Sequence, residues 1–293
     1  MHKLSNTPLP CWSGTTRGLA ALVLAASVAA AWGAPTTPFT FVESGIYGPQ
    51  GEQLGRVAFD QSQTHGVDVM IGTAPGAYAR TRSEFGSNGI DYVLSARARR
   101  ELAGGSGWSD GFTIFGFSGS VPISTRLTGE IAGESDLVYA LFVSALPFDV
   151  DALFAAVGSD SFDDSDPQLP NAQRLFFTGF VSGCGTSRAS RGCGRLLIEN
   201  YEGPVDLPMV GRIEFVEGQP VHVLSILIAE VDDQGGRLNF INSADFGISI
   251  PHTATYRTLS GSEYTAAIPE PATALILLGG LGLLGARKRL QHL

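Results

Sequence analysis

The sequence predicts an all-β protein, with a single β-sandwich or jelly-roll-like ectodomain between an N-terminal signal peptide and a C-terminal transmembrane sorting helix. Short runs in which apolar and polar residues alternate recur along the body at intervals of about 8–15 residues, as in sandwich folds. Gly supplies 37 of the 293 residues and separates these runs, because Gly adopts the positive φ angles of hairpin turns. Helical periodicity is weak and confined to residues 149–157.

Charge is distributed unevenly along the chain. The two lysines, Lys3 and Lys288, stand at opposite ends, and the net charge of the whole chain is −9. Between Ala34 and Ile268 there are 14 Arg against 27 Asp and Glu, which gives 14 − 27 = −13. An acidic body repels phosphate backbones, so nucleic acid is excluded as a partner.

The N-terminus has the three parts of a secretory signal peptide. Residues 1–17 are polar and basic, residues 18–31 form an apolar run, and Ala31-Trp32-Gly33 fits a small-residue cleavage site. We therefore predict a signal peptide over residues 1–33, read by the general secretion machinery, and a mature chain that begins near Ala34. An uncleaved anchor is the alternative, but the apolar run is shorter than the roughly 20 residues of a membrane span.

The body, residues 34–262, is predicted to be one domain, since it shows no internal repeat and no long linker. The Gly/Ser-rich residues 103–107 are predicted to break one strand from the next, and Asp232-Asp233 before Gln234 to form a turn. The predicted strands cover residues 53–60, 66–73, 77–85, 91–102, 111–117, 123–131, 137–145, 174–181, 195–200, 211–216, 221–229, 238–242, 246–250 and 253–259.

Cys184 and Cys193 are predicted to form a disulfide. The third cysteine, Cys11, lies in the signal peptide, so the mature chain carries an even number in an oxidising compartment. Closing this short loop would stabilise the protein by about 2–3 kcal/mol. A metal site is the alternative, but it would need two more ligands, and no His lies nearby.

Asp160, Asp163, Asp164 and Asp166 form the densest acidic cluster. Calcium takes six to eight oxygen ligands, and clustered carboxylates in a loop can supply several. The spacing lacks the register of an EF-hand. Calcium is therefore a candidate ligand at these four residues, and a solvated acidic loop without metal is the alternative.

The sequence predicts no catalytic residues. Gly107-Trp108-Ser109-Asp110-Gly111 matches the nucleophile-elbow pattern G-x-S-x-G, but that motif needs a preceding strand and a following helix, and neither is predicted. We interpret it as a β-turn. His65, His222 and His252 have no metal or catalytic spacing. A non-enzymatic protein is predicted; the alternative is a secreted carbohydrate-active or other hydrolytic enzyme whose carboxylate pair the sequence does not reveal.

The C-terminus has three parts in order. Pro269-Glu270-Pro271 comes first, an apolar stretch over residues 272–286 follows, and Arg287, Lys288 and Arg289 form a basic stop. As a helix the apolar stretch would cover about 22 Å, close to the hydrocarbon thickness of a thin bilayer. The basic triplet marks the cytoplasmic side, which places the body outside. Pro269 and Pro271 disfavour helix and hold Glu270 in an extended segment.

These three parts resemble the PEP-CTERM sorting domain of bacterial envelope proteins. The resemblance covers about residues 267–289, within a sorting region predicted over residues 263–293. It implies recognition and cleavage by an exosortase, a membrane cysteine protease of Gram-negative bacteria that make exopolysaccharide. It also implies an inner-membrane-anchored precursor, followed by release or display in the envelope, at the surface or in the biofilm matrix. We therefore expect a structural or adhesive protein associated with exopolysaccharide. A plain C-terminal membrane anchor is the alternative for the tail.

Overall fold

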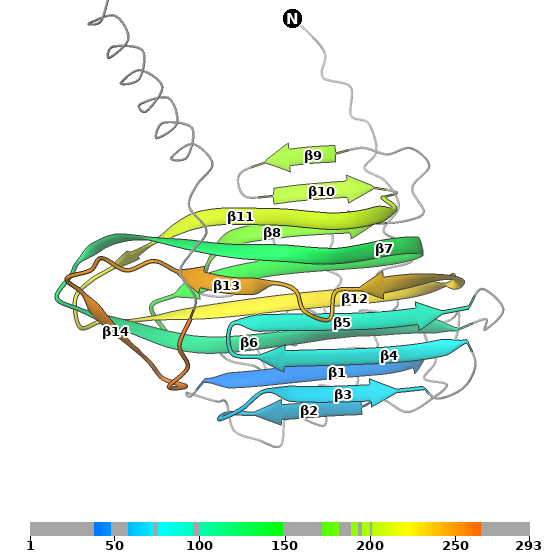
Figure 1. Ribbon diagram of the computed structural model, residues 1–293, viewed down its shortest axis with the longest axis horizontal. Coiled ribbons are helices and arrows are strands. Elements are labelled where there is room, and N and C mark those ends of the chain that lie inside the picture. Colours follow the sequence, from blue (N-terminus) through cyan, green and yellow to red (C-terminus); the bar gives the residue numbers. More distant parts are fainter. Residues whose placement is uncertain are drawn as a thin grey trace, which may run out of the picture.

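Every strand of the structure belongs to one hydrogen-bonded sheet that folds over on itself (Figure 1). The computed structural model describes residues 38–47, 58–72, 76–95, 100–148, 172–181, 189–192, 195–199 and 201–264. Within these ranges the structure is all β, which confirms the all-β part of the prediction. The same ranges hold no helix with the length and apolar character needed to cross a membrane.

The strands are β1 (Phe39–Tyr47), β2 (Ala58–Ser62), β3 (Val67–Ile71), β4 (Ala77–Glu84), β5 (Ser87–Leu94), β6 (Glu101–Phe115), β7 (Gly119–Ser144), β8 (Ala172–Val181), β9 (Ala189–Gly192), β10 (Arg195–Glu199), β11 (Gly203–Phe215), β12 (Pro220–Asn239), β13 (Asp245–Ile248) and β14 (Thr255–Thr258). Their main path runs β2-β1-β6-β12-β7-β8-β10-β9, and we call it the long layer. The strands β3, β4 and β5 pack against β1 and β6 and begin a covering layer.

Two strands pass from one layer to the other. The first part of β12 pairs with β6 in the long layer, and its last residues, from Gly236, pair with β5 in the covering layer. The C-terminal half of β7 pairs with β12 and β8, whereas its N-terminal half pairs with β11 and β13. The register between β7 and β12 shifts between Val231 and Gly236, and both Gly133 and Gly235 have positive φ there. The two strands therefore bend together at this point.

Alternating side chains explain the layering. In β4 the buried positions are Ala77, Ala79, Thr81 and Ser83, while the residues between them are more exposed. In β6 nearly every residue is buried, because both faces of this central strand are covered. The core between the layers contains the largest fully buried side chains, among them Trp108, Tyr92, Tyr139, Phe112 and Phe240.

A second buried apolar cluster lies on the other face of the long layer. It comprises residues of β1, β7, β8 and β12, together with one residue that follows β7: Phe39, Phe41, Ala140, Phe142, Phe148, Phe177, Leu224, Ile226 and Ile228. The long layer is therefore apolar on both faces, in contrast to a sheet with one wet face.

Two turn predictions are wrong. The residues of the G-x-S-x-G match and the preceding Gly/Ser run lie inside β6, and Asp232-Asp233 lie inside β12. The glycines of β6 serve close packing rather than a turn, since a Cβ at Gly107 would approach Phe41 Cε1 to 2.3 Å and one at Gly105 would approach the Leu227 carbonyl oxygen to 3.0 Å. Asp232 lies between Val231 and Gly236, where the register between β12 and β7 shifts, so the chain changes direction there without leaving the strand.

Several connections between strands lie at one end of the molecule, and we call this end the exit end. It contains the β6–β7 connection (residues 116–118), the β11–β12 connection (216–219), the residues that follow β7 (145–148), and β14 with residues 259–264. In Figure 1 the β6–β7 connection and β14 lie together at the left. Phe39, the first residue of β1, pairs with Ser109 in the middle of β6.

Candidate functional site

The buried carboxylate of Asp110 ties the last described residues to the centre of the sheet. Asp110 lies on β6 and is 1% exposed. Its Oδ1 accepts hydrogen bonds from the backbone N–H of Gly111 at 2.8 Å and of Ser260 at 3.0 Å. Its Oδ2 accepts hydrogen bonds from the Tyr264 hydroxyl, at 2.7 Å, and from the Ser260 hydroxyl. Four donors thus satisfy a carboxylate that would be costly to bury alone.

The ring of Tyr264 completes an aromatic cluster in the core. Its centroid lies 4.8 Å from that of Phe112, 5.6 Å from that of Phe246 and 5.7 Å from that of Trp108. Burial, followed by the negative charge of Asp110, raises the pKa of Tyr264 above its ordinary value. The phenol therefore stays protonated and keeps donating to Asp110. We call Asp110, Ser260 and Tyr264 the C-terminal anchor.

Backbone contacts hold the rest of residues 258–264. The N–H of Leu259 donates to the Gly111 carbonyl at 2.9 Å, and the N–H of Tyr264 donates to the Tyr256 hydroxyl at 3.0 Å. The Thr258 hydroxyl donates to the Ser262 carbonyl at 2.9 Å. This segment is thus fixed by hydrogen bonds as well as by the buried ring.

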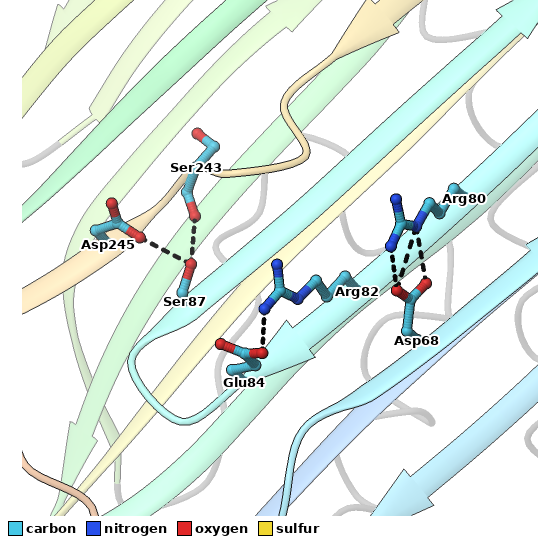
Figure 2. A network of polar contacts seen from close by, with 7 residues as sticks. All are labelled: Asp68, Arg80, Arg82, Glu84, Ser87, Ser243 and Asp245. Atoms are coloured by element: carbon cyan, nitrogen blue, oxygen red, sulfur yellow. Dashed lines mark hydrogen bonds and ion pairs between the residues drawn. The ribbon is translucent and has the colours of Figure 1, made fainter.

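An exposed polar network crosses the covering layer (Figure 2). Arg80 Nε donates to both carboxylate oxygens of Asp68, at 3.0 and 3.2 Å, and so joins β4 to β3. The Ser87 hydroxyl donates to Asp245 Oδ1 at 2.8 Å and so joins the β4–β5 turn to β13. Exposed ion pairs contribute little to stability, so we interpret this network as one that favours strand register.

The structure gives Ser109 no elbow geometry. The residue is 4% exposed in the middle of β6, where it pairs with β1 and β12.

His222, on β12, has its pKa lowered by burial, partly opposed by Asp110. His65 Nδ1 lies 2.9 Å from the Ser62 hydroxyl. Among the described residues no group of three or more His, Cys, Asp or Glu could hold a metal ion.

The sites predicted from sequence lie outside the described residues. They are the sorting residues Pro269, Glu270 and Pro271, the basic residues Arg287, Lys288 and Arg289, the disulfide pair Cys184 and Cys193, and the calcium candidates Asp160, Asp163, Asp164 and Asp166. The signal peptide and the apolar stretch 272–286 also lie outside them. The structure therefore tests none of these predictions.

Sequence reasoning missed the C-terminal anchor. Asp110 was visible only as part of the G-x-S-x-G match, and Tyr264 lies two residues past the predicted end of the ectodomain. The missed signal was a lone Asp between Trp108 and Phe112, which sit at alternating positions with it and face the core. In a strand, an acidic residue whose neighbours two positions away on each side face the core also faces the core. A carboxylate buried in this way needs hydrogen-bond donors around it.

The comparisons with known proteins find one family. Residues 267–289 match the PEP-CTERM protein-sorting motif. No curated protein matches the chain. The motif begins three residues after Tyr264 and is the sorting signal that exosortase recognises. The chain thus carries a PEP-CTERM motif and is an exported protein, sorted by its C-terminal tail through a membrane-passing precursor.

Proposed function

We propose that the protein is a non-enzymatic structural or adhesive component of the cell envelope or extracellular matrix, delivered by its sorting tail and associated with exopolysaccharide. The observation that carries this proposal is the short distance along the chain between the core and the sorting signal. Tyr264, partly buried, packs against the core, and the matched motif begins at residue 267. The β body is thus joined directly to the sorting tail, which would deliver it.

The body is suited to remain folded after the tail is removed. Cleavage near Pro269–Pro271 would leave a new C-terminus about five residues beyond Tyr264. Chain ends fray unless they are tied down, and the C-terminal anchor ties this one to β6 through Asp110. We further propose that the body is one β-sandwich domain, since its two layers share β7 and β12.

Sorting is tested by comparing the parent strain with a strain that lacks its exosortase. Mass spectrometry of the envelope-associated protein should find an N-terminus near Ala34 and no residues beyond the Pro269–Pro271 region in the parent strain. The strain without exosortase should retain the tail. An intact chain reaching Leu293 in the parent strain would contradict sorting by cleavage and would leave a plain anchor.

The structural role is tested with the processed protein and the exopolysaccharide of the same strain. We expect co-sedimentation with the polysaccharide and no release of reducing ends over a day. Turnover that a single Asp or Glu to Ala change abolishes, in a protein that still folds, would overturn the non-enzymatic proposal.

Calcium binding is tested in the same samples, because a bound calcium ion should raise the Tm of the protein.

A further inference from the structure

Both ends of the described chain lie in the half of the body that leads to the exit end, because Phe39 pairs with Ser109 and Tyr264 donates to Asp110, both in the second half of β6. At the C-terminal side, Tyr264 lies against Gly86 in the β4–β5 turn, where an added Cβ would approach its ring to 2.9 Å. The predicted signal peptide and the sorting tail therefore attach to the same half of the molecule.

The exit end also carries most of the exposed large apolar side chains. Among the described residues seven such side chains are exposed, and four of them lie here: Phe115 (39%), Leu146 (56%), Val216 (57%) and Leu259 (52%). The other three, Phe59, Met70 and Val93, are spread over β2, β3 and β5. Single exposed apolar residues are ordinary, but this share at one end is a reason to look for a partner there.

The four side chains come from segments that the structure holds together. Gly116 N–H donates to Glu217 Oε1 at 2.7 Å, which joins the connection after Phe115 to the one that contains Val216. Leu259 lies over Gly111, and Gly111 pairs with His222, which in turn pairs with Ser144 just before Leu146. The guanidinium of Arg257 lies 5.8 Å from the Phe115 ring centroid.

Chain length keeps the body close to the bilayer while the tail is embedded. Eight residue steps separate Tyr264 from Ala272, where the apolar stretch begins, and at full extension they span about 28 Å. The C-terminal anchor limits the length of this tether, because Tyr264 packs against the core and donates to Asp110. The polar headgroup region on one side of a bilayer is only about 6 Å thick.

We propose that the exit end is a membrane-facing surface, on which Phe115, Leu146, Val216 and Leu259 contact the lipid interface while the precursor is anchored. This inference rests on the proposed function, because the tail must hold the body at the bilayer. One aromatic and three aliphatic side chains, with Arg257 beside Phe115, suit the interface, where apolar groups enter the headgroups and a guanidinium reaches phosphate. The contact is weak alone and becomes effective through the high local concentration that the tether provides.

The test uses the full chain reconstituted into vesicles of phosphatidylcholine brominated near the headgroup, which quenches nearby Trp fluorescence. Two variants, Val216→Trp and Leu259→Trp, place the probe at the exit end, and Met70→Trp is the matched control on exposed β3. We expect quenching of at least about twofold for the added Trp of V216W and L259W and none for that of M70W, after subtraction of the parent protein. Hydrogen exchange of the unsubstituted protein should also slow at residues 114–118 and 216–219 on vesicles, which keeps the test valid if a variant fails to fold.

Flotation of the vesicles separates the two proposals. A chain that does not float would overturn membrane insertion of the tail, and this inference with it. A chain that floats without quenching at V216W and L259W, or with equal quenching at M70W, would overturn this inference alone. As a further control, the tail is cut and the released body is separated from the vesicles. If the added Trp were still quenched in that body, the quenching would not report contact with lipid and would count against this inference.

Discussion

At the scale of single residues, Asp110 shows how one buried charge organises a chain end. It receives four hydrogen bonds, three of them from residues 150 or more positions away. A carboxylate this deep forces its donors to stay in place, because losing one leaves a buried acceptor unsatisfied. Small substitutions that remove a donor from the anchor should therefore destabilise the protein.

Replacing Tyr264 by Phe keeps the ring in the aromatic cluster but removes the hydroxyl that donates to Asp110. We expect the free energy of unfolding to fall by about 1–3 kcal/mol, measured by urea denaturation. Tyr201→Phe is the control, since the Tyr201 hydroxyl makes an exposed bond to the Pro204 carbonyl. Equal losses in the two variants would contradict a special role for the anchor.

Glu230 gives a pH-dependent prediction. Burial raises its pKa well above the ordinary value, and Asp136 of β7, Glu101 of β6 and Asp232 raise it further. A raised pKa means that the folded state holds the proton more tightly, so stability falls as pH rises from about 4.5 through the folded-state pKa. Glu230→Gln should therefore raise the Tm at pH 7 and have little effect at pH 4.

The control for that experiment is Glu214→Gln, at an exposed position on β11. Its Tm should follow that of the parent protein across the same pH range. If E230Q and the parent protein melted alike at pH 7, the buried carboxylate would not be an electrostatic cost.

At the scale of elements, the bend shared by β7 and β12 depends on backbone shape. Gly133 has φ +72°, and a Cβ there would approach the Gly235 carbonyl oxygen to 2.5 Å. Gly218 also has φ +72°, but a Cβ there meets nothing within 4 Å. The two glycines separate the cost of the left-handed conformation from the cost of a clash.

Replacing each glycine by Ala should therefore give different losses. Gly218→Ala should cost about 1–2 kcal/mol, the price of the left-handed region alone. Gly133→Ala should cost clearly more, because the added methyl group meets the backbone of β12. Chemical denaturation measures both, and a smaller loss for G133A than for G218A would show that the bend yields easily.

The sequence predicted the class of fold and the positions of many strands, because alternation survives wherever one face is more exposed than the other. It failed in β6, where Gly and Ser fill a strand buried on both faces and leave no alternation to read. It also failed at Asp232, where a strand bends without ending. The C-terminal anchor could not be predicted, since Asp110 and Tyr264 meet only through the complete sheet.

At the scale of the whole molecule, residues 259–264 finish the core rather than link it to the tail. A chain that stops after Thr258 would leave Trp108, Phe112 and Phe246 without the Tyr264 ring. We expect its Tm to fall by about 10 °C, as for the loss of a large buried aromatic side chain. A chain that stops after Ala266 is the control and should melt like the processed protein.

The pairing of β6 with β12 has a consequence for timing. Their residues lie over a hundred positions apart, and Tyr264 meets Asp110 across 154 positions. Contacts between such distant segments form slowly, and here they need nearly all of the chain up to the sorting signal to be present. A chain that crosses the membrane with its N-terminus first would complete its fold only as the sorting signal arrives, so final folding and recognition of the tail would be nearly simultaneous.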